Sequence, residues 1–247
     1  MDNPDPDADG YESNAISVRG GVRPVDGLSI EGHALRNEGR NEFDADPMFG
    51  LGDVSNTVQQ VGGGKAKWDH GRVSLTPAGG NNVDRSLQSR NDAFADFFES
   101  HRASASLQAD VRVAAGQVAT FGYDWQRDTG HVEDLFSQYD ARRQNRAVFA
   151  QYQGAFGAHD VQASVRRDDN EQFGGHTTGA LAWGVDLSNG FRITANAGSA
   201  FKAPTFNELY FPFFGNPDLA PEESETFELG VGQERNAWHW DVYAFQT

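Results

Sequence analysis

The sequence predicts an all-β protein, an antiparallel transmembrane β-barrel segment of about 12 strands, and three observations support this fold class. Apolar and polar side chains alternate along many long stretches of the chain. The connections between these stretches are alternately short and long. Turn-forming and aromatic residues are frequent, with 28 Gly and 9 Pro among 247 residues and 12% aromatics. Short turns on one rim and long loops on the other are typical of outer-membrane barrels.

Alternation with a period of two is clear in several stretches of the chain. Residues 103–113 alternate between apolar and polar from Ala103 to Val113, and residues 191–197 continue the same pattern. Because successive side chains of a strand point to opposite faces, each stretch predicts a strand with one apolar and one polar face. The polar residues that we expect to face the barrel lumen are Ser104, Gln108, Asp110, Arg192, Thr194 and Asn196.

The alternation and the turn signals together predict twelve strands in chain order. The first six are expected at residues 14–23, 28–37, 56–68, 71–77, 101–113 and 117–128. The second six are expected at residues 144–156, 159–168, 177–187, 191–201, 223–234 and 237–247. Short turns link the two strands of each successive pair. Long loops between the pairs are expected at residues 38–55, 78–100, 129–143, 169–176 and 202–222.

A soluble β-sandwich or up-and-down barrel is the alternative fold, since it also has one apolar face. Strands in such proteins average about 5–6 residues, and their loops do not alternate strictly in length. The pattern therefore favours the membrane barrel. The five tryptophans lie near predicted strand ends, as in the aromatic girdles of membrane barrels, although tryptophans of a soluble core would look similar. They are Trp68, Trp125, Trp183, Trp238 and Trp240.

Composition excludes several other classes of protein. The 36 acidic and 20 basic side chains give a formal net charge of −16, which argues against binding to nucleic acid. The mean hydropathy is −0.62, and no apolar run approaches the ~18 residues of a membrane-spanning helix. Cysteine is absent, so disulfides and thiolate metal sites are excluded. The start of the chain is acidic and has no apolar stretch, so we expect no signal peptide there.

Both ends of the chain suggest an internal segment of a larger barrel. Residues 1–13 are expected to be a truncated extracellular loop, and residues 14–247 to form six β-hairpins of one partial barrel domain. The pattern still indicates a strand at Thr247. An open sheet would leave two unpaired edges in lipid, which a bilayer does not tolerate.

Several motifs carry a family resemblance. Residues 201–210 read FKAPTFNELY, residues 215–222 read GNPDLAPE, and residues 228–230 read ELG. They closely resemble a long barrel loop and the following strand of TonB-dependent outer-membrane receptors. The vitamin B12 (cobalamin) branch of that family is resembled by four further segments. These are DDNEQFG at 168–174, DWQ at 124–126, PDADGY at 6–11 and the loop that contains Phe43 and Asp44.

The resemblance implies a function in uptake rather than catalysis. Receptors of this family are 22-stranded barrels in the outer membrane of Gram-negative bacteria, with an N-terminal plug domain that couples to the TonB complex. Their ligand is a scarce cofactor or metal chelate. We therefore expect the chain to be part of the barrel wall and extracellular loops, without the plug. The expected partners are outer-membrane lipid and a ligand that is cobalamin or, as the alternative, a siderophore.

A calcium site is expected in the extracellular loops of the full-length protein. Residues 1–13 and the loop at 38–55 should be neighbours on one rim, and both are acidic. Calcium takes six to eight oxygen ligands, which two such loops could share. Cobalamin transporters bind calcium in their apical loops, and the resemblance places the matching positions at Asp7, Asp9 and Asp44. A solvated acidic loop is the alternative interpretation.

The acidic stretch at 208–228 has no Lys or Arg between Ala203 and Glu234, and we expect its role to be structural. Its two proline-containing turns are expected to shape a loop that folds over the rim. Phe211, Phe213 and Phe214 could contact an apolar ligand face, and packing within the loop explains them equally well. The substrate-binding residues are not predicted.

No motif for catalysis is found, and no catalytic cofactor is expected. Gly62-Gly63-Gly64-Lys65 lacks the earlier glycine and the following Ser or Thr of a phosphate-binding loop. The seven histidines are too scattered for a metal site, and no Gly-x-Ser-x-Gly motif occurs. A self-contained 12-stranded barrel enzyme, such as an outer-membrane phospholipase, is the alternative from a different functional class.

Overall fold

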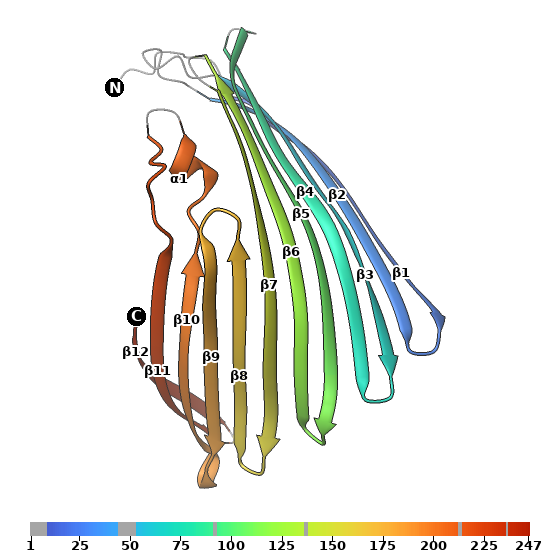
Figure 1. Ribbon diagram of the computed structural model, residues 1–247, viewed down its shortest axis with the longest axis vertical. Helices are drawn as coiled ribbons and strands as arrows, with labels where there is room; N and C mark the ends of the chain where they lie inside the picture. Colours follow the sequence, from blue (N-terminus) through green and yellow to red (C-terminus); the bar gives the residue numbers. More distant parts are fainter. Residues whose placement is uncertain (1–8, 44–52, 91–92, 136–137, 212–213, 236) are drawn as a thin grey trace.

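The computed structural model describes residues 9–43, 53–90, 93–135, 138–211, 214–235 and 237–247. Within this part of the chain, twelve antiparallel strands form one sheet, in which every strand pairs with its neighbours in sequence (Figure 1). The first six are β1 (Tyr11–Val25), β2 (Leu28–Glu42), β3 (Val54–His70), β4 (Val73–Arg90), β5 (Ala93–Ala114) and β6 (Gln117–Asp134). The others are β7 (Gln138–Phe156), β8 (His159–Asn170), β9 (Gly174–Asp186), β10 (Phe191–Lys202), β11 (Glu222–Arg235) and β12 (Trp238–Gln246).

Two short helical segments interrupt the connections between strands. The 3-10 turn η2 (Ser188–Gly190) links β9 to β10, and the single-turn helix α1 (Phe206–Tyr210) lies between β10 and β11. Figure 1 shows the short turns at the bottom of the sheet and α1 at the top. No helix in the described ranges is both long enough and apolar enough to cross a membrane.

All twelve predicted strands are present in the predicted order, so the all-β antiparallel class is confirmed. Two predicted loops are wrong. The region 78–100 is mostly strand, since β4 continues to Arg90 and β5 begins at Ala93. The region 129–143 is likewise mostly strand, because β6 continues to Asp134 and β7 begins at Gln138.

The physical reason for this error lies in the upper ends of β4–β7. Their sequences mix polar and apolar residues on both faces, as in Phe97-Phe98-Glu99-Ser100 of β5, so they lack the regular alternation that marks a strand in the bilayer. The hydrogen-bond ladder does not require that alternation, and pairing continues from Asn82 to Ser89 against β5. The predicted boundary of the first loop, residues 1–13, is also corrected, since β1 begins at Tyr11.

The pairing register separates the sheet into an apolar and a polar face. Leu107, Tyr123 and Val148 are direct cross-strand partners on the apolar face. Ser104, Gln126, Asn145 and Asn170 form a similar row on the polar face. Side chains opposite one another in an antiparallel pair project to the same side, so each row extends across several strands.

Exposure confirms that the apolar face is uncovered in this sheet. Val148 is 55% exposed, whereas Ala147, its neighbour on the polar face, is 2% exposed. Exposed apolar side chains continue along the same face of the neighbouring strands: Phe121, Tyr123, Val165, Leu181, Leu229 and Val242. Soluble monomers rarely expose a continuous apolar surface of this kind, whereas lipid covers it in a membrane barrel.

The five tryptophans all project from the apolar face. Trp68 pairs with Leu28 and Leu75, and Trp125 pairs with Ala105. By register, Trp183 on β9 and Trp238 and Trp240 on β12 project from the same face. All except Trp125 lie near the rim of short turns, which is the arrangement of an interfacial aromatic girdle.

The sheet curves toward its polar face. A hollow of about 1180 Å³ extends along that face from β1 to β8, and its lining includes Arg19, Lys65, Asp124 and Arg166. A hollow that spans so many strands requires a concave sheet. The polar side chains therefore line the inside of the curve, and the apolar face forms its outside.

Two adjacent residues of β8 test this assignment of faces. Val165 projects from the apolar face beside Ala150, and Ser164 projects from the polar face beside Gln151. We expect Val165→Arg to destabilise the protein folded in lipid vesicles by about 2–4 kcal/mol, because it places a charge against the hydrocarbon. Ser164→Arg, the matched control, should change the free energy of unfolding much less. Equal losses in a denaturant titration would contradict the assignment.

Candidate functional site

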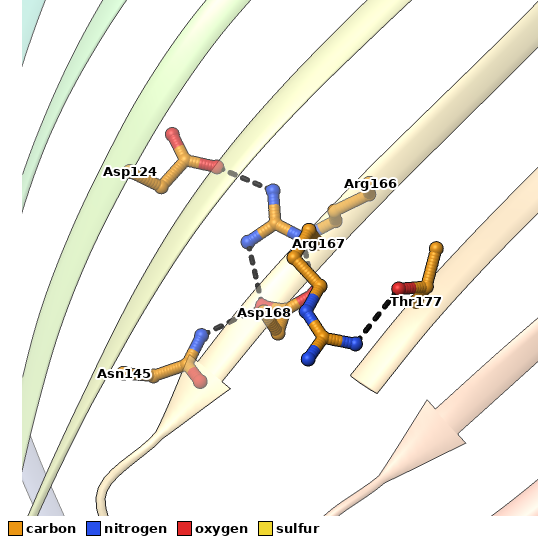
Figure 2. A network of polar contacts seen from close by, with 6 residues as sticks. All are labelled: Asp124, Asn145, Arg166, Arg167, Asp168 and Thr177. Atoms are coloured by element: carbon orange, nitrogen blue, oxygen red, sulfur yellow. Dashed lines mark hydrogen bonds and ion pairs between the residues drawn. The ribbon is translucent and has the colours of Figure 1, made fainter. Parts of the chain in front are cut away.

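The candidate site lies on the polar face of β5–β8, where charged side chains form a connected network (Figure 2). Arg166 on β8 is its centre. Its guanidinium binds Asp168 with two hydrogen bonds, Nε to Oδ2 at 2.9 Å and Nη2 to Oδ1 at 3.1 Å. Nη1 also donates to Asp124 Oδ2 at 2.6 Å. This fork geometry is the one in which arginine binds carboxylates most specifically.

The alternation of the strand explains why neighbouring arginines have different partners. Arg166 and Asp168 are two residues apart and share the polar face, whereas Arg167 points away from it. Figure 2 shows Arg167 diverging from Arg166 toward Thr177, whose hydroxyl accepts from Nη1 at 2.9 Å. Asn145 donates to Asp168 Oδ1 at 2.7 Å, while its own Oδ1 is buried without a partner among the described residues.

A second ion pair continues the network toward β5. Arg102 Nε donates to Asp128 Oδ1 at 2.6 Å, and Gln126 Nε2 donates to Asp128 Oδ2 at 2.8 Å. These pairs are partly exposed, so each contributes little to stability. Their main consequence is for the surface itself, because the charges of Arg102 and Arg166 are matched by carboxylates. The wall thus offers hydrogen-bonding groups without a strong local charge.

The connection between β10 and β11 begins with a capping box. The Thr205 hydroxyl accepts from the Glu208 backbone N–H at 3.2 Å, and the Glu208 carboxylate accepts from the Thr205 backbone N–H at 2.6 Å. This reciprocal pair satisfies N–H groups at the start of α1. The same Thr205 N–H bond, followed by its hydroxyl and then by nearby Lys202, lowers the pKa of Glu208 below its ordinary value.

The α1 segment folds inward over the polar face. Arg143 on β7 donates from Nη1 to the Pro204 carbonyl at 2.8 Å, and its guanidinium lies 5.0 Å from the centre of the Phe206 ring. Phe206 packs against Gly130 so closely that a Cβ there would lie 2.9 Å from its ring. Tyr139 donates to Asn207 at 2.8 Å. These contacts hold the segment against the upper ends of β6 and β7.

A hollow of about 390 Å³ lies on the polar face beside this segment. Its lining combines the paired Arg102 and Arg166, and Arg143 beside α1, with uncharged polar groups of β6–β9. The uncharged polar side chains that line it from the polar face are Gln126, Asn145, Asn170 and Thr178, while Gln144 and Ser199, which project from the other face, border it. Amides and hydroxyls both donate and accept, so this hollow suits a polar ligand with many hydrogen-bonding groups.

The six residues predicted to face the lumen all lie on the polar face. Asp110 accepts from Thr120 at 2.7 Å, Arg192 binds Asp160 and Asp186, and Asn196 donates to Glu228 at 2.8 Å. Ser104, Gln108 and Thr194 share the face by register. Only Ser104 of the six lines the large hollow, and Arg192, Thr194 and Asn196 lie nearer the short turns.

Of the three residues expected to bind calcium, the structure describes one. Asp7 and Asp44 lie outside the described residues, and Asp9 is described and exposed. Within the described ranges, no group of three His, Asp or Glu residues is arranged to hold a metal ion. The bases of the two loops are neighbours, as expected, because Tyr11 pairs with Asn41 and Gly10 N donates to Glu42 Oε2 at 3.1 Å.

Several carboxylates of the acidic stretch at 208–228 have partners within the protein. Glu208 closes the capping box, Glu222 lies 3.3 Å from Lys202 Nζ, and Glu223 lies 3.1 Å from His176 Nδ1. The stretch begins at the segment that folds inward over the rim. Phe214 is 85% exposed, while Phe211 contacts it at a ring separation of 6.5 Å.

Sequence reasoning missed the anchor of this segment. Thr205-x-x-Glu208 is a capping-box signature and could have revealed α1 before the structure. Arg143 carried no such signal, because it follows Arg142 in a polar region and its partners in this segment, Pro204 and Phe206, are more than 60 residues later in the chain.

Comparison with known proteins bears on this site and on the whole sheet. A family model described as TonB dependent receptor-like, beta-barrel, matches residues 3–247. The chain belongs to the TonB-dependent receptor family. Receptors of this family are outer-membrane proteins of Gram-negative bacteria that act in uptake, and the family is not one of enzymes.

Individual TonB-dependent receptors resemble the chain over different lengths. It is 25% identical over 242 residues to the vitamin B12 transporter BtuB of Photobacterium profundum, covering 98% of the chain and 39% of that protein. It is 40% identical over 87 residues to BtuB of Vibrio vulnificus, covering 35% of the chain and 14% of that protein. The chain spans about two fifths of the length of the first of these relatives.

A solved receptor structure has the same fold. The ferric enterobactin receptor PfeA of Pseudomonas aeruginosa, as a variant in complex with enterobactin, superposes with a TM-score of 0.83 at 13% identity. The match covers 96% of the chain and 43% of that receptor. At this identity the likeness concerns the TonB-dependent receptor fold alone.

The anchor on Arg143 gives a prediction for the α1 segment. Arg143→Gln removes the bond to Pro204 and the contact with Phe206, which together contribute about 1–3 kcal/mol. We expect chymotrypsin to cleave the segment at Phe206–Phe211 about tenfold faster in this variant. Arg142→Gln is the matched control, because Arg142 is exposed on the opposite face. Equal cleavage of both variants would contradict the anchor.

Proposed function

We propose that this chain forms part of the wall and the extracellular loops of an outer-membrane receptor that takes up cobalamin in a TonB-dependent manner. The observation that carries this proposal is the match to a vitamin B12 transporter over 98% of the chain. In such a receptor, the polar face lines the lumen and the apolar face contacts lipid. The long connections then lie on the extracellular rim, and strands outside this chain pair with the free edges of β1 and β12.

The chemistry of the polar face supports cobalamin over a ferric siderophore. Cobalamin carries many amide groups and little net charge, whereas ferric complexes of catecholate siderophores are strongly anionic. In the described part of the hollow beside α1, Arg102 and Arg166 are already paired with carboxylates. The remaining lining combines Arg143, which is bound to the Pro204 carbonyl and stacks on Phe206, with the uncharged side chains of Gln126, Asn145, Asn170 and Thr178. These amides and the hydroxyl suit an amide-rich ligand.

A siderophore receptor is the second candidate. The observation in its favour is the likeness to PfeA, which was solved with enterobactin. That likeness concerns the fold, so it carries less weight than the sequence match to the vitamin B12 transporters. The two candidates are separated by the ligand that the protein binds.

Ligand binding tests the proposal on the protein produced with its complete reading frame. We expect equilibrium dialysis to detect cyanocobalamin binding, with no competition from ferric enterobactin. Thr178→Tyr should weaken binding about tenfold or more, because a bulky ring in the hollow costs about 1–3 kcal/mol. Thr177→Tyr is the matched control, since Thr177 projects from the apolar face. Binding of ferric enterobactin instead would replace cobalamin by the second candidate.

We also propose that Asp7, Asp9 and Asp44 hold calcium in the full-length receptor. The pairing of Tyr11 with Asn41 supports this proposal by bringing the bases of the two loops together. Bound calcium would join the loops on the extracellular rim and order them for ligand capture.

The calcium proposal has its own test. We expect calcium to tighten cyanocobalamin binding, and Asp7→Ala combined with Asp9→Ala to abolish that effect, because two carboxylate ligands are lost. Asp26→Ala in the short turn at the opposite rim is the control and should leave the calcium effect intact. A calcium effect that survives in the double variant would overturn this assignment.

A further inference from the structure

The apolar face carries an unusual group of arginines on β6–β8. Arg142, Arg146 and Arg167 are exposed on this face, and Arg127 lies beside them, with its guanidinium 5.6 Å from the centre of the Trp125 ring. The register brings them together, because Arg146 pairs with Trp125 and Arg167 pairs with Val148. We call these four residues the outward arginine patch.

Carboxylates do not neutralise this patch. Across the described ranges, none of the four arginines has a carboxylate oxygen within ion-pair distance. Asp169, which pairs in register with Arg146, and Glu171, whose carboxylate accepts from the Gln144 backbone N–H at 2.8 Å, are the acidic residues facing the patch. Asp140, higher on β7, is bound to His131 at 2.7 Å. Glu133 is near the same histidine. Four arginines therefore face two carboxylates, neither of which forms an ion pair with them, in a chain whose formal net charge is −16.

Other outward-facing arginines of the sheet provide a contrast. Arg36, Arg40 and Arg85 also project from the apolar side above the apolar band. Arg36 is paired with Glu38, Arg40 with Glu42 at 3.0 Å, and Arg85 with Glu99. The arginines of the patch thus differ from these three outward arginines in having no carboxylate partner.

The height of the patch places it at a membrane surface. On β7, ten residues separate Phe156 at the short turn from Arg146. At about 3.3 Å per residue and a strand tilt of about 40°, they span about 25 Å, which is the height of the apolar band of a membrane barrel. Tyr123, Val148 and Val165 lie directly below the arginines and are exposed. The patch thus begins where hydrocarbon gives way to headgroups.

We propose that the outward arginine patch binds the phosphate groups of an anionic lipid in the leaflet at the long-loop rim. Guanidinium groups bind phosphate oxygens in a bidentate manner, and exposed arginines with no carboxylate partner are free to do so. Val148, Val165 and Tyr123 contact the acyl chains of the same lipid. This inference rests on the membrane insertion in the proposed function and not on the identity of the transported ligand.

Fluorescence of Trp125 provides a local test. The protein with its complete reading frame is inserted into phosphatidylcholine nanodiscs that contain a minor fraction of brominated phosphatidylglycerol or brominated phosphatidylcholine. Bromine quenches tryptophan on contact, and the signal of Trp125 is isolated by subtracting the Trp125→Phe protein. We expect the anionic lipid to quench Trp125 at a concentration about tenfold lower than the zwitterionic lipid does.

Matched variants distinguish an effect of the patch on lipid preference from an effect of the protein's net charge. Arg142→Gln, Arg146→Gln and Arg167→Gln combined should abolish the preference, whereas Arg36→Gln, Arg40→Gln and Arg85→Gln combined should preserve it at the same change in net charge. Arg146→Gln alone, the milder change, should weaken the preference about fivefold. A preference that survives in the patch variants, or that is lost equally in the control, would overturn the inference.

Whether the protein inserts into the bilayer distinguishes a failure of this inference from a failure of the proposed function. Wild-type protein that enters both bilayers but is quenched equally by both lipids would overturn the lipid site and leave the uptake function in place. Wild-type protein that enters neither bilayer would overturn both.

Discussion

The backbone hydrogen-bond ladder is the constraint on which the rest of this structure depends. In hydrocarbon, every N–H and C=O must find a partner within the protein, and antiparallel pairing of each strand with its neighbours provides this. The ladder fixes the direction of every side chain with a period of two. This alternation of side-chain direction determines which residues contact lipid, which residues line the lumen, and where the arginines of β6–β8 lie.

The two faces meet their surroundings in different ways. On the concave face, arginines are paired with aspartates, as Arg166 is with Asp124 and Asp168. This pairing keeps the surface hydrated while it lowers the net charge around these arginines. On the convex face, apolar side chains are left open, and the outward arginines without partners lie above them. The α1 segment adds a third element, since Arg143 and Gly130 hold Phe206 inside the curve.

Much of the fold could be predicted from the sequence, because apolar and polar residues alternate in stretches such as 103–113, and this alternation marks the two faces of a strand. The upper ends of β4–β7 could not, since polar and apolar residues are mixed there without regular alternation, as in a loop. The polar lumen residues were placed correctly for the same reason as the strands. The partners of Arg143 and Arg166 depend on register between distant strands, which a single sequence does not specify.

The positions of the register shifts determine where the length of a strand can change. In the described ladders, the irregularities fall near the rims, between Val22 and Val25, Gln88 and Ser89, and Arg112 and Ala114. Through the middle of the sheet the ladders run without interruption. A single codon gained or lost there would exchange lipid-facing and water-facing residues for the remainder of the strand, whereas two codons would restore them. The genes of such sheets should therefore tolerate length changes within strands chiefly in even steps, and odd steps at the loops.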